Sequence, residues 1–530
     1  MSEKLTGKNY IGNLLASTGS HLFKTFNPVL NTENPTVFTE ASILEINQAV
    51  VLASQAFDAF KNTSIKDRAA FLNAIVKEIE RLDFALIKQY CLETGLTEQR
   101  AEGERTRTLH QLRSFAQHIL EGKWMEASID SSRENKAAVP SPDLRKINIA
   151  LGPVVVFGAS NFPLAYSTAG GDTASAFAAG CPVIVKSHPM HAGTGEMIAS
   201  AIIKAAEDTG MPNGVFSNLN SKGIEVGLQL VSHPLVKAVG FTGSIQAGRA
   251  LYNLASKRPE PIPFFGEMGS VNPVILLPNE LSINAHKWAN TYADSITLGA
   301  GQFCTNPGLI LGLKSSSLDD FLHHLAKKVE EKSPLCMLHP SIYKNFEHHK
   351  KTLSEQKGVD IVARYNEDFQ ENFGSQTIAT VSGSDFLNNK TVQQEVFGPF
   401  SMVVQCQDKE ELTAIIRSLD GQLTGTIIGN TEDLQDYSAV INQLKNRVGR
   451  LIFNGVSTGV EVCPSMFHGG PYPASTDSRF TAVGIDSIKR WLRPFSYQNC
   501  PDHLLPEGLK NSNPLKISRR INGVDTMNNL

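Results

Sequence analysis

One cysteine stands in a loop of small residues that suits a nucleophile. Residues 299–308 read Gly-Ala-Gly-Gln-Phe-Cys-Thr-Asn-Pro-Gly, with Cys304 among glycines. A thiolate is strongly nucleophilic, and glycines leave room beside it for a substrate carbon and for backbone N–H donors. The competing interpretation is a buried cysteine that packs as a small apolar residue. The loop sequence alone does not distinguish a nucleophile from a structural cysteine, so the rest of the chain has to be considered.

Two other residues could complete a site around such a thiol. Asn161 follows the apolar run 152–157, and Glu267 stands in the small-residue turn Gly266-Glu267-Met268-Gly269. A carbonyl under attack needs hydrogen-bond donors for its oxyanion, and a thiol or a water molecule needs a base. Asn161, Glu267 and Cys304 together predict a site in which a thiol attacks a carbonyl carbon.

The segments around Asn161 and Glu267 belong to an alternating series of strands and helices. Short apolar runs, of the kind buried on both faces of a sheet, alternate three times with helical stretches. The predicted elements lie at 152–157, 165–180, 182–186, 193–208, 236–241 and 244–255. This order predicts an α/β fold with a parallel sheet whose strand ends carry ligands. Gly243 and Ser244 follow the third strand in a glycine-rich turn, which serves either a phosphate or close packing.

The remaining segments predict a scaffold. We expect helices at 42–61, from 64 to about 93 and at 98–120, and a second α/β series from 274 to about 455. Arg105, Arg107 and Arg113 lie in the third of these helices and are either a solvated face or distant candidates for an anion. The residues from Pro501 onward are polar and rich in proline and asparagine, and predict an arm or tail rather than a core element.

Bulk composition excludes several classes of partner. The chain has 530 residues and a formal charge of -3, so no general attraction to nucleic acid or to an anionic membrane is expected. Its seven cysteines are scattered and form no C-x-x-C pair, which predicts a reducing compartment and no metal site. No apolar segment approaches the length of a membrane span, and residues 1–7 contain no apolar signal region. We therefore expect a cytoplasmic protein.

Motifs along nearly the whole chain resemble those of the aldehyde dehydrogenase family. They are Asn161-Phe162-Pro163, Lys186, Gly240-Phe241-Thr242-Gly243-Ser244, Gly266-Glu267-Met268-Gly269, Gly301-Gln302-Phe303-Cys304 and Glu395-Val396-Phe397-Gly398-Pro399. The resemblance implies a Rossmann-like cofactor-binding domain, an α/β catalytic domain and a small bridging or oligomerisation element. The implied ranges are 1–124 and 151–268 for the first, 269–470 for the second, and 125–150 and 485–530 for the bridging element and tail. The resemblance also implies a homodimer or a homotetramer.

The same resemblance implies a role for each motif residue. Cys304 would attack an aldehyde, the Asn161 side chain and the Cys304 N–H would hold the oxyanion, and Glu267 would be the base for water. The thiohemiacetal would pass a hydride to a nicotinamide and leave a thioester, which water hydrolyses to the acid. The implied cofactor contacts are Lys186, Glu395 and Phe397 at the ribose and nicotinamide, and Gly243 and Ser244 at the phosphates. Ser270 departs from the family pattern, in which Gly-Gly-Lys is common after the glutamate and leucine.

The residues after Lys186 bear on the choice of cofactor. Many NAD-using relatives place a glutamate three positions beyond this lysine, where it binds ribose hydroxyls and repels a 2′-phosphate. This chain has Pro189 there, and His188, with Lys222 as a helper, could meet the phosphate. The pattern resembles the NADP-preferring branch, although NAD stays possible. The alternative is that His188 is a surface histidine without a role.

The C-terminal stretch bears on the substrate. Residues 458–463 and 468–479 resemble the α-ketoglutaric semialdehyde (2,5-dioxovalerate) dehydrogenases, and also an NADP-dependent branch that acts on fatty aldehydes. A substrate that ends in a carboxylate profits from a guanidinium fork, so Arg479 favours the first branch. An ion pair between Arg479 and Asp477 is an equal alternative. Phe162 is a second candidate substrate contact.

Two other classes of function compete with aldehyde oxidation. A cysteine hydrolase or acyltransferase would use Cys304 without redox chemistry, and an inactive dehydrogenase scaffold would only bind. The nucleotide-binding turn and the motif at Glu395 favour the dehydrogenase over the first. The presence of Cys304, Asn161 and Glu267 together weakens the second. The sequence does not choose the aldehyde or the number of subunits.

Overall fold

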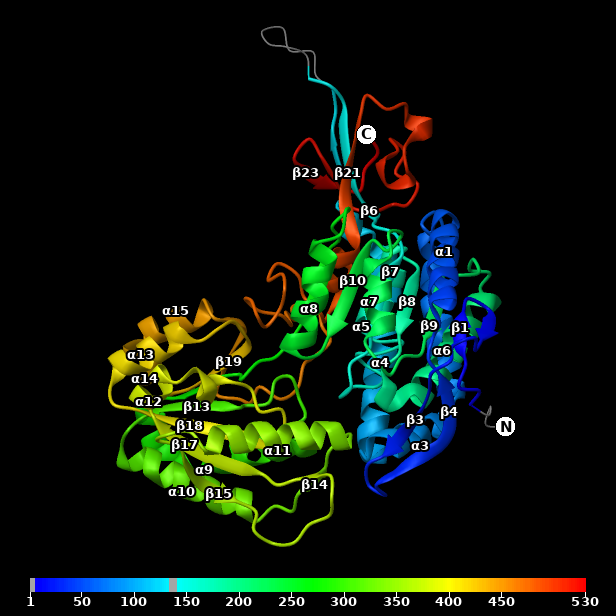
Figure 1. Cartoon of the computed structure of the whole chain (residues 1–530). Coiled ribbons are helices and arrows are strands. Elements are labelled where there is room, and N and C mark those ends of the chain that lie inside the picture. The colour runs from blue at the N-terminus through cyan, green and yellow to red at the C-terminus, as the bar shows by residue number, and fades with distance from the viewer. Residues whose placement is uncertain (1–4, 133–140) are drawn as a thin grey trace.

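Three β-sheets organise the chain in a computed structural model that describes residues 5–132 and 141–530. Two sheets have seven strands each and the third has five, and two short strand pairs complete the β-structure of the described residues. Figure 1 shows the two large sheets in separate lobes, with the third sheet projecting from the first lobe. The predicted α/β architecture is confirmed.

The first seven-stranded sheet carries the strand ends to which the site residues were assigned. In spatial order its strands are β11 (Phe264–Glu267), β10 (Ala238–Thr242), β7 (Val154–Phe157), β8 (Val183–Lys186), β9 (Phe216–Leu219), β1 (Asn9–Ile11) and β2 (Leu14–Ala16). The strands from β11 to β9 are parallel, whereas β1 and β2 are antiparallel additions. The chain reverses its direction of addition between β7 and β10, and ligands bind at such a switch point in open α/β sheets.

Helices cover both faces of this sheet, which explains its apolar strands. Val154 and Val156 face one cluster of buried side chains, whereas Val155 and Phe157 face another. The first cluster includes α2 (Ile65–Arg81), α4 (Glu98–Glu121), α5 (Gly171–Ala179) and α6 (Ala192–Asp208), and the second α1 (Ile43–Phe60), α7 (Glu225–Ser232) and α8 (Ile245–Ser256). A strand buried on both faces has no polar alternation, so the continuous apolar runs were the right signal.

The second seven-stranded sheet supports the cysteine loop. Its strands, in spatial order, are β15 (Asp360–Arg364), β17 (Thr377–Ser382), β18 (Phe400–Cys406), β13 (Leu309–Leu313), β12 (Val274–Leu276), β19 (Gln422–Ile428) and β20 (Val448–Phe453). Only β15 runs antiparallel to its neighbour. Its helices are α9 (Pro278–Thr297), α10 (Ser316–Glu330), α11 (Pro340–Ser354), α12 (Gly383–Asn388), α13 (Lys409–Ser418), α14 (Thr431–Asp436) and α15 (Ser438–Lys445).

The prediction of one long helix from 64 to about 93 was wrong. The segment forms two helices, α2 and α3 (Asp83–Thr94), and Asp83 adopts a φ of 44° between them. The apolar positions continue across this break, so periodicity alone did not reveal it. Gly95, with a φ of 68°, ends α3 as predicted.

The prediction that the residues from Pro501 onward form an arm or tail rather than a core element was wrong about the core. Leu505, Leu509 and Ile517 are buried and join the core of the first lobe. The third sheet consists of β21 (Leu492–Gln498), β6 (Leu144–Ala150), β5 (Ser128–Asp130), β22 (Arg519–Ile521) and β23 (Val524–Thr526). The segment from Pro501 onward has few apolar residues, and polar residues separate them, so its sequence shows no hydrophobic periodicity. Residues 133–140 of the predicted bridging element lie outside the described residues.

Several elements of the first lobe had no prediction. They are β1, β2, β9, α7 and the hairpin β3 (Leu22–Asn27) and β4 (Thr32–Thr39). In the second lobe the short strands β14 (Leu335–Cys336) and β16 (Phe373–Gly374) were likewise not foreseen. Among the described residues, none of the helices has both the length and the apolar character that a bilayer span requires. The division into the predicted domain ranges stays a prediction.

Candidate active site

The loop that presents Cys304 is held by specific contacts. Gly301 has a φ of 64°, and a Cβ on it would lie 2.3 Å from the carbonyl oxygen of Gly398, so a larger residue would strike backbone. The side chain of Gln302 accepts a hydrogen bond from the Leu338 N–H at 2.9 Å. The amide of Asn272 donates to the Cys304 carbonyl oxygen, also at 2.9 Å. These contacts fix the position of the thiol.

Cys304 lies where two cavities meet. The arginine-side cavity, of about 300 Å³, is lined by Arg100, Arg107, Phe162, Tyr166, Phe303 and Cys304 together with further residues of α4 and of the 459–460 loop. The strand-end cavity, of about 280 Å³, is lined by Asn161, Gly243, Ser244, Glu267, Glu395, Phe397 and Cys304, with further residues of α11. Two ligands can therefore approach one sulfur from different sides.

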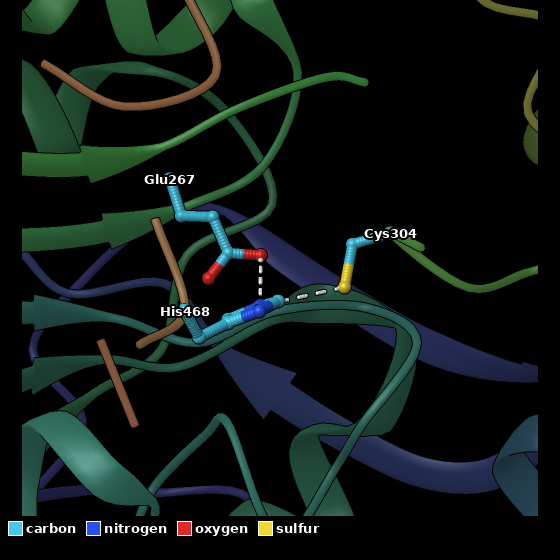
Figure 2. Close-up of side chains that lie close together, drawn as sticks. All are labelled: Glu267, Cys304 and His468. Atoms are coloured by element: carbon cyan, nitrogen blue, oxygen red, sulfur yellow. Dashed lines mark hydrogen bonds and ion pairs between the residues drawn. The ribbon is translucent and has the colours of Figure 1, made fainter. Parts of the chain in front are cut away.

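A histidine completes the surroundings of the thiol. Nε2 of His468 lies 2.9 Å from Oε1 of Glu267 and 3.7 Å from Sγ of Cys304. Figure 2 shows the imidazole between the carboxylate and the thiol. The His468 and Glu267 side chains are only 1% and 3% exposed. This close group couples a nucleophile to two groups that can accept its proton.

Sequence reasoning missed His468. The residue was quoted within the stretch that bears on the substrate, but its separation from Cys304 by 164 residues hides the contact. The available signal was the need of a thiol for a base, which a histidine meets. In the structure the C-terminal stretch contacts the residues beside the thiol. The N–H of Met268, the neighbour of Glu267, donates to the Ala474 carbonyl at 2.8 Å, and the Thr481 hydroxyl accepts a hydrogen bond from the His468 N–H at 2.9 Å.

The resting thiol of Cys304 is protonated. Burial raises its pKa well above the ordinary value, and the negative charges of Glu267 and Glu395 raise it further, while Arg107 lowers it. Attack by sulfur therefore requires transfer of the proton to a neighbour. Oε2 of Glu267 is buried without a hydrogen-bond partner, so this carboxylate keeps a free acceptor.

Asn161 reaches the same point from the end of β7. Its Nδ2 donates to the carbonyl oxygen of Gln302 at 3.1 Å, two residues before the nucleophile. The structure thus brings the three predicted residues, Asn161, Glu267 and Cys304, around one place. Their catalytic roles stay a prediction until variants are measured.

Four predicted cofactor residues line the strand-end cavity: Gly243, Ser244, Glu395 and Phe397. Ser244 caps α8 by accepting a hydrogen bond from the Ala247 N–H at 3.3 Å, so the N-terminus of this helix opens on the cavity. A Cβ on Gly269 would lie 2.4 Å from Oε2 of Glu395, so glycine is needed for the carboxylate to sit there. Burial raises the pKa of Glu395 to about 7.

Lys186, His188 and Lys222 form a separate basic group at the ends of β8 and β9. Burial lowers the pKa of Lys186 to about 8, and its Nζ donates to the Ser221 carbonyl at 3.4 Å. His188 is half-buried and accepts a hydrogen bond from the Met190 N–H at 3.3 Å. Burial and the nearby cations hold the pKa of His188 well below its ordinary value. Its ring is therefore neutral and part of the fold rather than a free surface side chain.

Arg479, a predicted substrate contact, lies outside both cavities that contain Cys304. Its side chain is 80% exposed. Its Nε and Nη2 pair with Asp477 at 2.9 and 2.6 Å. The alternative, a local ion pair, is the arrangement observed, because Asp477 is two residues away. Phe162, the other candidate, does line the arginine-side cavity.

Comparison with known proteins assigns the family. The model of the aldehyde dehydrogenase family matches residues 15–476, and the chain belongs to this family of oxidoreductases. It is 44% identical to alpha-ketoglutaric semialdehyde dehydrogenase 2 of Azospirillum brasilense, over 98% of this chain and 99% of that protein. It is 42% identical to the alpha-ketoglutaric semialdehyde dehydrogenase of Acinetobacter baylyi over the full length of both.

Solved structures share the fold. A variant of betaine aldehyde dehydrogenase from Staphylococcus aureus, solved with NAD+, matches with a TM-score of 0.79 at 19% identity, over 94% of this chain and 97% of that one. A variant of 1-pyrroline-5-carboxylate dehydrogenase from Thermus thermophilus matches with a TM-score of 0.78 at 21% identity, over 93% and 92% of the chains. The predicted family, fold and enzyme class are confirmed.

Proposed function

We propose that this enzyme oxidises α-ketoglutaric semialdehyde (2,5-dioxovalerate) to 2-oxoglutarate with NADP. The observation that carries the chemistry is the position of Cys304 between two cavities, beside Glu267, His468 and Asn161. The names of the two full-length relatives at 44% and 42% identity support the substrate.

The strand-end cavity suits the nicotinamide end of a dinucleotide. Gly243 and Gly269 line it, and the N-terminus of α8 provides N–H groups for a phosphate. Glu395 supplies a carboxylate for ribose hydroxyls. A dinucleotide bound there supplies the hydride acceptor of the reaction.

A preference for NADP over NAD is supported by the basic group at the ends of β8 and β9. Pro189 stands where a carboxylate would repel a 2′-phosphate, and Lys186, His188 and Lys222 lie nearby. A neutral imidazole can donate one N–H to a phosphate and gains a proton as the anion approaches. Use of NAD is the alternative.

The first half of the mechanism follows from the contacts of the thiol. When Nε2 of His468 carries the ring proton and donates to Oε1, the thiol proton passes to the Glu267 carboxylate; in the other tautomer it passes to Nε2. In both cases Sγ forms a bond to the aldehyde carbon. The oxygen of that carbon then carries negative charge, and Nδ2 of Asn161 and the Cys304 N–H are the donors for it. Removal of one such donor costs about 100- to 1,000-fold in rate in other enzymes.

The second half requires a base for water. After oxidation the acyl group is a thioester on Cys304. Once the proton taken from the thiol has left to solvent, Glu267 accepts a proton from water while the water oxygen bonds to the acyl carbon, and the carbon–sulfur bond breaks. The acid leaves and the thiol regains its proton. The free Oε2 of Glu267 is suited to this role, because Oε1 is held by His468.

A substrate panel with both cofactors tests the proposal. Initial rates with 2,5-dioxovalerate, succinic semialdehyde and medium-chain alkyl aldehydes would be measured with NADP and NAD. We expect the highest kcat/KM for 2,5-dioxovalerate with NADP. A preference for alkyl aldehydes would favour the fatty-aldehyde branch, and a preference for NAD would overturn the cofactor assignment. Thioester or ester hydrolysis without cofactor reduction would indicate a cysteine hydrolase.

We also propose that the enzyme is a homodimer or homotetramer that uses the third sheet as a contact surface. β21 is an edge strand of that sheet, and the side chain of Phe495 on it is exposed. Unpaired edges of this kind are suited to association with a second copy. Sedimentation of the full chain would measure the number of subunits. A cytoplasmic location stays a prediction from the scattered cysteines, all seven of which are free thiols.

A further inference from the structure

The arginine-side cavity places two cations opposite the nucleophile. Arg100 and Arg107 are two turns apart on α4, which puts both on the same face of the helix. Both line the cavity, whose walls are the rings of Phe162, Tyr166 and Phe303. Apolar walls exclude water and strengthen the attraction of a cation for an anion.

Arg107 is fixed in position by the walls. One of its terminal nitrogens donates to the Val460 carbonyl, and the other donates to the Tyr166 hydroxyl at 3.1 Å. Its Nε is buried and has no hydrogen-bond partner. Its charge is felt at Cys304, where it lowers the thiol pKa against the effect of burial. The guanidinium is thus held within range of the reacting centre.

Arg100 has weaker polar contacts. Its guanidinium carbon lies 4.3 Å from the ring centroid of Phe162 and 4.9 Å from that of Phe303. The nearest carboxylate oxygen is that of Glu104, 3.8 Å from Nε, and this Nε is also buried without a hydrogen-bond partner.

Glu104 does not neutralise this pair of cations. Its carboxylate accepts hydrogen bonds from the Leu164 and Ala165 N–H groups at 2.8 and 2.9 Å and from the Tyr90 hydroxyl at 2.6 Å. The cavity therefore has two guanidinium groups, and Glu104 forms an ion pair with only one of them, Arg100. A ligand with a negative charge at one end would complete the balance.

We infer that Arg100 and Arg107 bind the carboxylate at the far end of an ω-carboxylated aldehyde, whose other end meets Cys304. The inference rests on the proposed function and deepens it by assigning the carboxylate subsite. The cavity that holds the two arginines also contains Sγ, so a short chain with an aldehyde at one end and a carboxylate at the other can span them. An alkyl aldehyde would leave Arg107 without an anion and Arg100 with only the Glu104 carboxylate. The subsite takes over the role that sequence reasoning gave to Arg479.

Substitution of the two arginines tests the inference. The variants are Arg100→Met and Arg107→Met, and the control is Arg113→Met, which removes a surface ion pair with Glu80 from the same helix. For each, kcat/KM is measured with 2,5-dioxovalerate and with pentanal, which has the same number of carbons and no carboxylate. We expect kcat/KM for 2,5-dioxovalerate divided by kcat/KM for pentanal to fall about 10- to 100-fold in each cavity variant, the range for a lost charge-assisted hydrogen bond. The ratio should not change in Arg113→Met.

The ratio separates carboxylate binding from other effects. Because Arg107 also lowers the pKa of Cys304, its variant changes both rates, but only loss of a carboxylate contact changes their ratio. Arg100→Lys and Arg107→Lys keep the charge and should restore part of the preference. A ratio equal to that of the unsubstituted enzyme in both Met variants would overturn the inference. If the unsubstituted enzyme itself shows no preference for the carboxylated aldehyde, the proposed function fails instead.

Discussion

The two cavities that meet at Cys304 differ in charge and in origin. The arginine-side cavity has guanidinium groups from α4 and aromatic walls, whereas the strand-end cavity has the carboxylates of Glu267 and Glu395 among small residues. An anionic substrate tail is favoured in the first and opposed by the carboxylates of the second. The difference indicates that charge, as well as shape, orients the aldehyde so that its carbon meets the sulfur.

Removal of the shared sulfur should have the largest effect. Cys304→Ala removes the sulfur atom that bonds to the aldehyde. We therefore expect no reduction of cofactor with any aldehyde, as measured by the absorbance of the reduced nicotinamide. Cofactor binding, measured by fluorescence titration, should persist. Cys500→Ala, at a half-buried thiol far along the chain, is the control. Normal turnover of Cys304→Ala would disprove the assignment of the nucleophile.

Glu267→Gln should separate the two halves of the reaction. The first turnover still forms the thioester and one equivalent of reduced cofactor, but hydrolysis loses its base. We expect a burst followed by a steady-state rate lower by about 100- to 10,000-fold, the range for loss of general-base catalysis. Rapid mixing measures both phases. A steady-state rate equal to that of the unsubstituted enzyme would remove Glu267 from this role.

His468→Gln tests the proton path on the thiol itself. The amide can still donate to Glu267, but it cannot accept the thiol proton. We expect the rate constant for alkylation of Cys304 by iodoacetamide at neutral pH to fall about 10-fold, with its pH profile shifted upward. A purely structural role would lower folding stability without moving the pH profile, which a thermal melt would reveal.

The pH dependence of cofactor binding tests the strand-end cavity alone. Burial raises the pKa of Glu395 to about 7, so this side chain is ionised above that pH and protonated below it. A ribose that needs the ionised form binds best above pH 7, and its affinity falls as pH drops through that value. We expect a few-fold rise in Kd between pH 8 and pH 6, of the order given by one titrating contact. Glu395→Gln should bind weakly with a flat profile, and an equally sloped profile in that variant would exclude Glu395 as the source.

Arg479→Met should have the smallest effect. The side chain is exposed and paired only with Asp477, and such surface pairs contribute about 0–1 kcal/mol to stability. We expect kcat/KM for the carboxylated aldehyde to change less than about two-fold, the scale of a surface substitution. A large loss would return the carboxylate subsite to Arg479 and remove the contrast with Arg100.

The sequence predicted the strand-end cavity better than the arginine-side cavity. Asn161 and Ser244 follow strands and Glu267 is the last residue of one. Because the carboxyl ends of parallel strands meet at one edge, their order along the chain indicates their place in space. Arg100 and Arg107 belong to a helix with the charge pattern of a solvated face. Only tertiary packing against Phe162 and the 459–460 loop turns that face inward.

Dependence on tertiary packing also limited the prediction of the fold and of His468. Buried strands such as β7 can be predicted from their continuous apolar residues, whereas the segment from Pro501 onward buries only isolated apolar residues. His468 sits among glycines with no local pattern, and its contact with Glu267 spans 201 residues. Local periodicity does not contain a contact of that separation.

The protonated state of Cys304 affects how fast its sulfur is oxidised. Peroxides oxidise thiolates much faster than thiols, so a thiol kept protonated by burial and by two carboxylates reacts slowly. Attack on an aldehyde therefore requires that His468 or Glu267 take the proton. The raised thiol pKa that makes attack depend on a neighbouring base therefore also slows irreversible oxidation of the nucleophile.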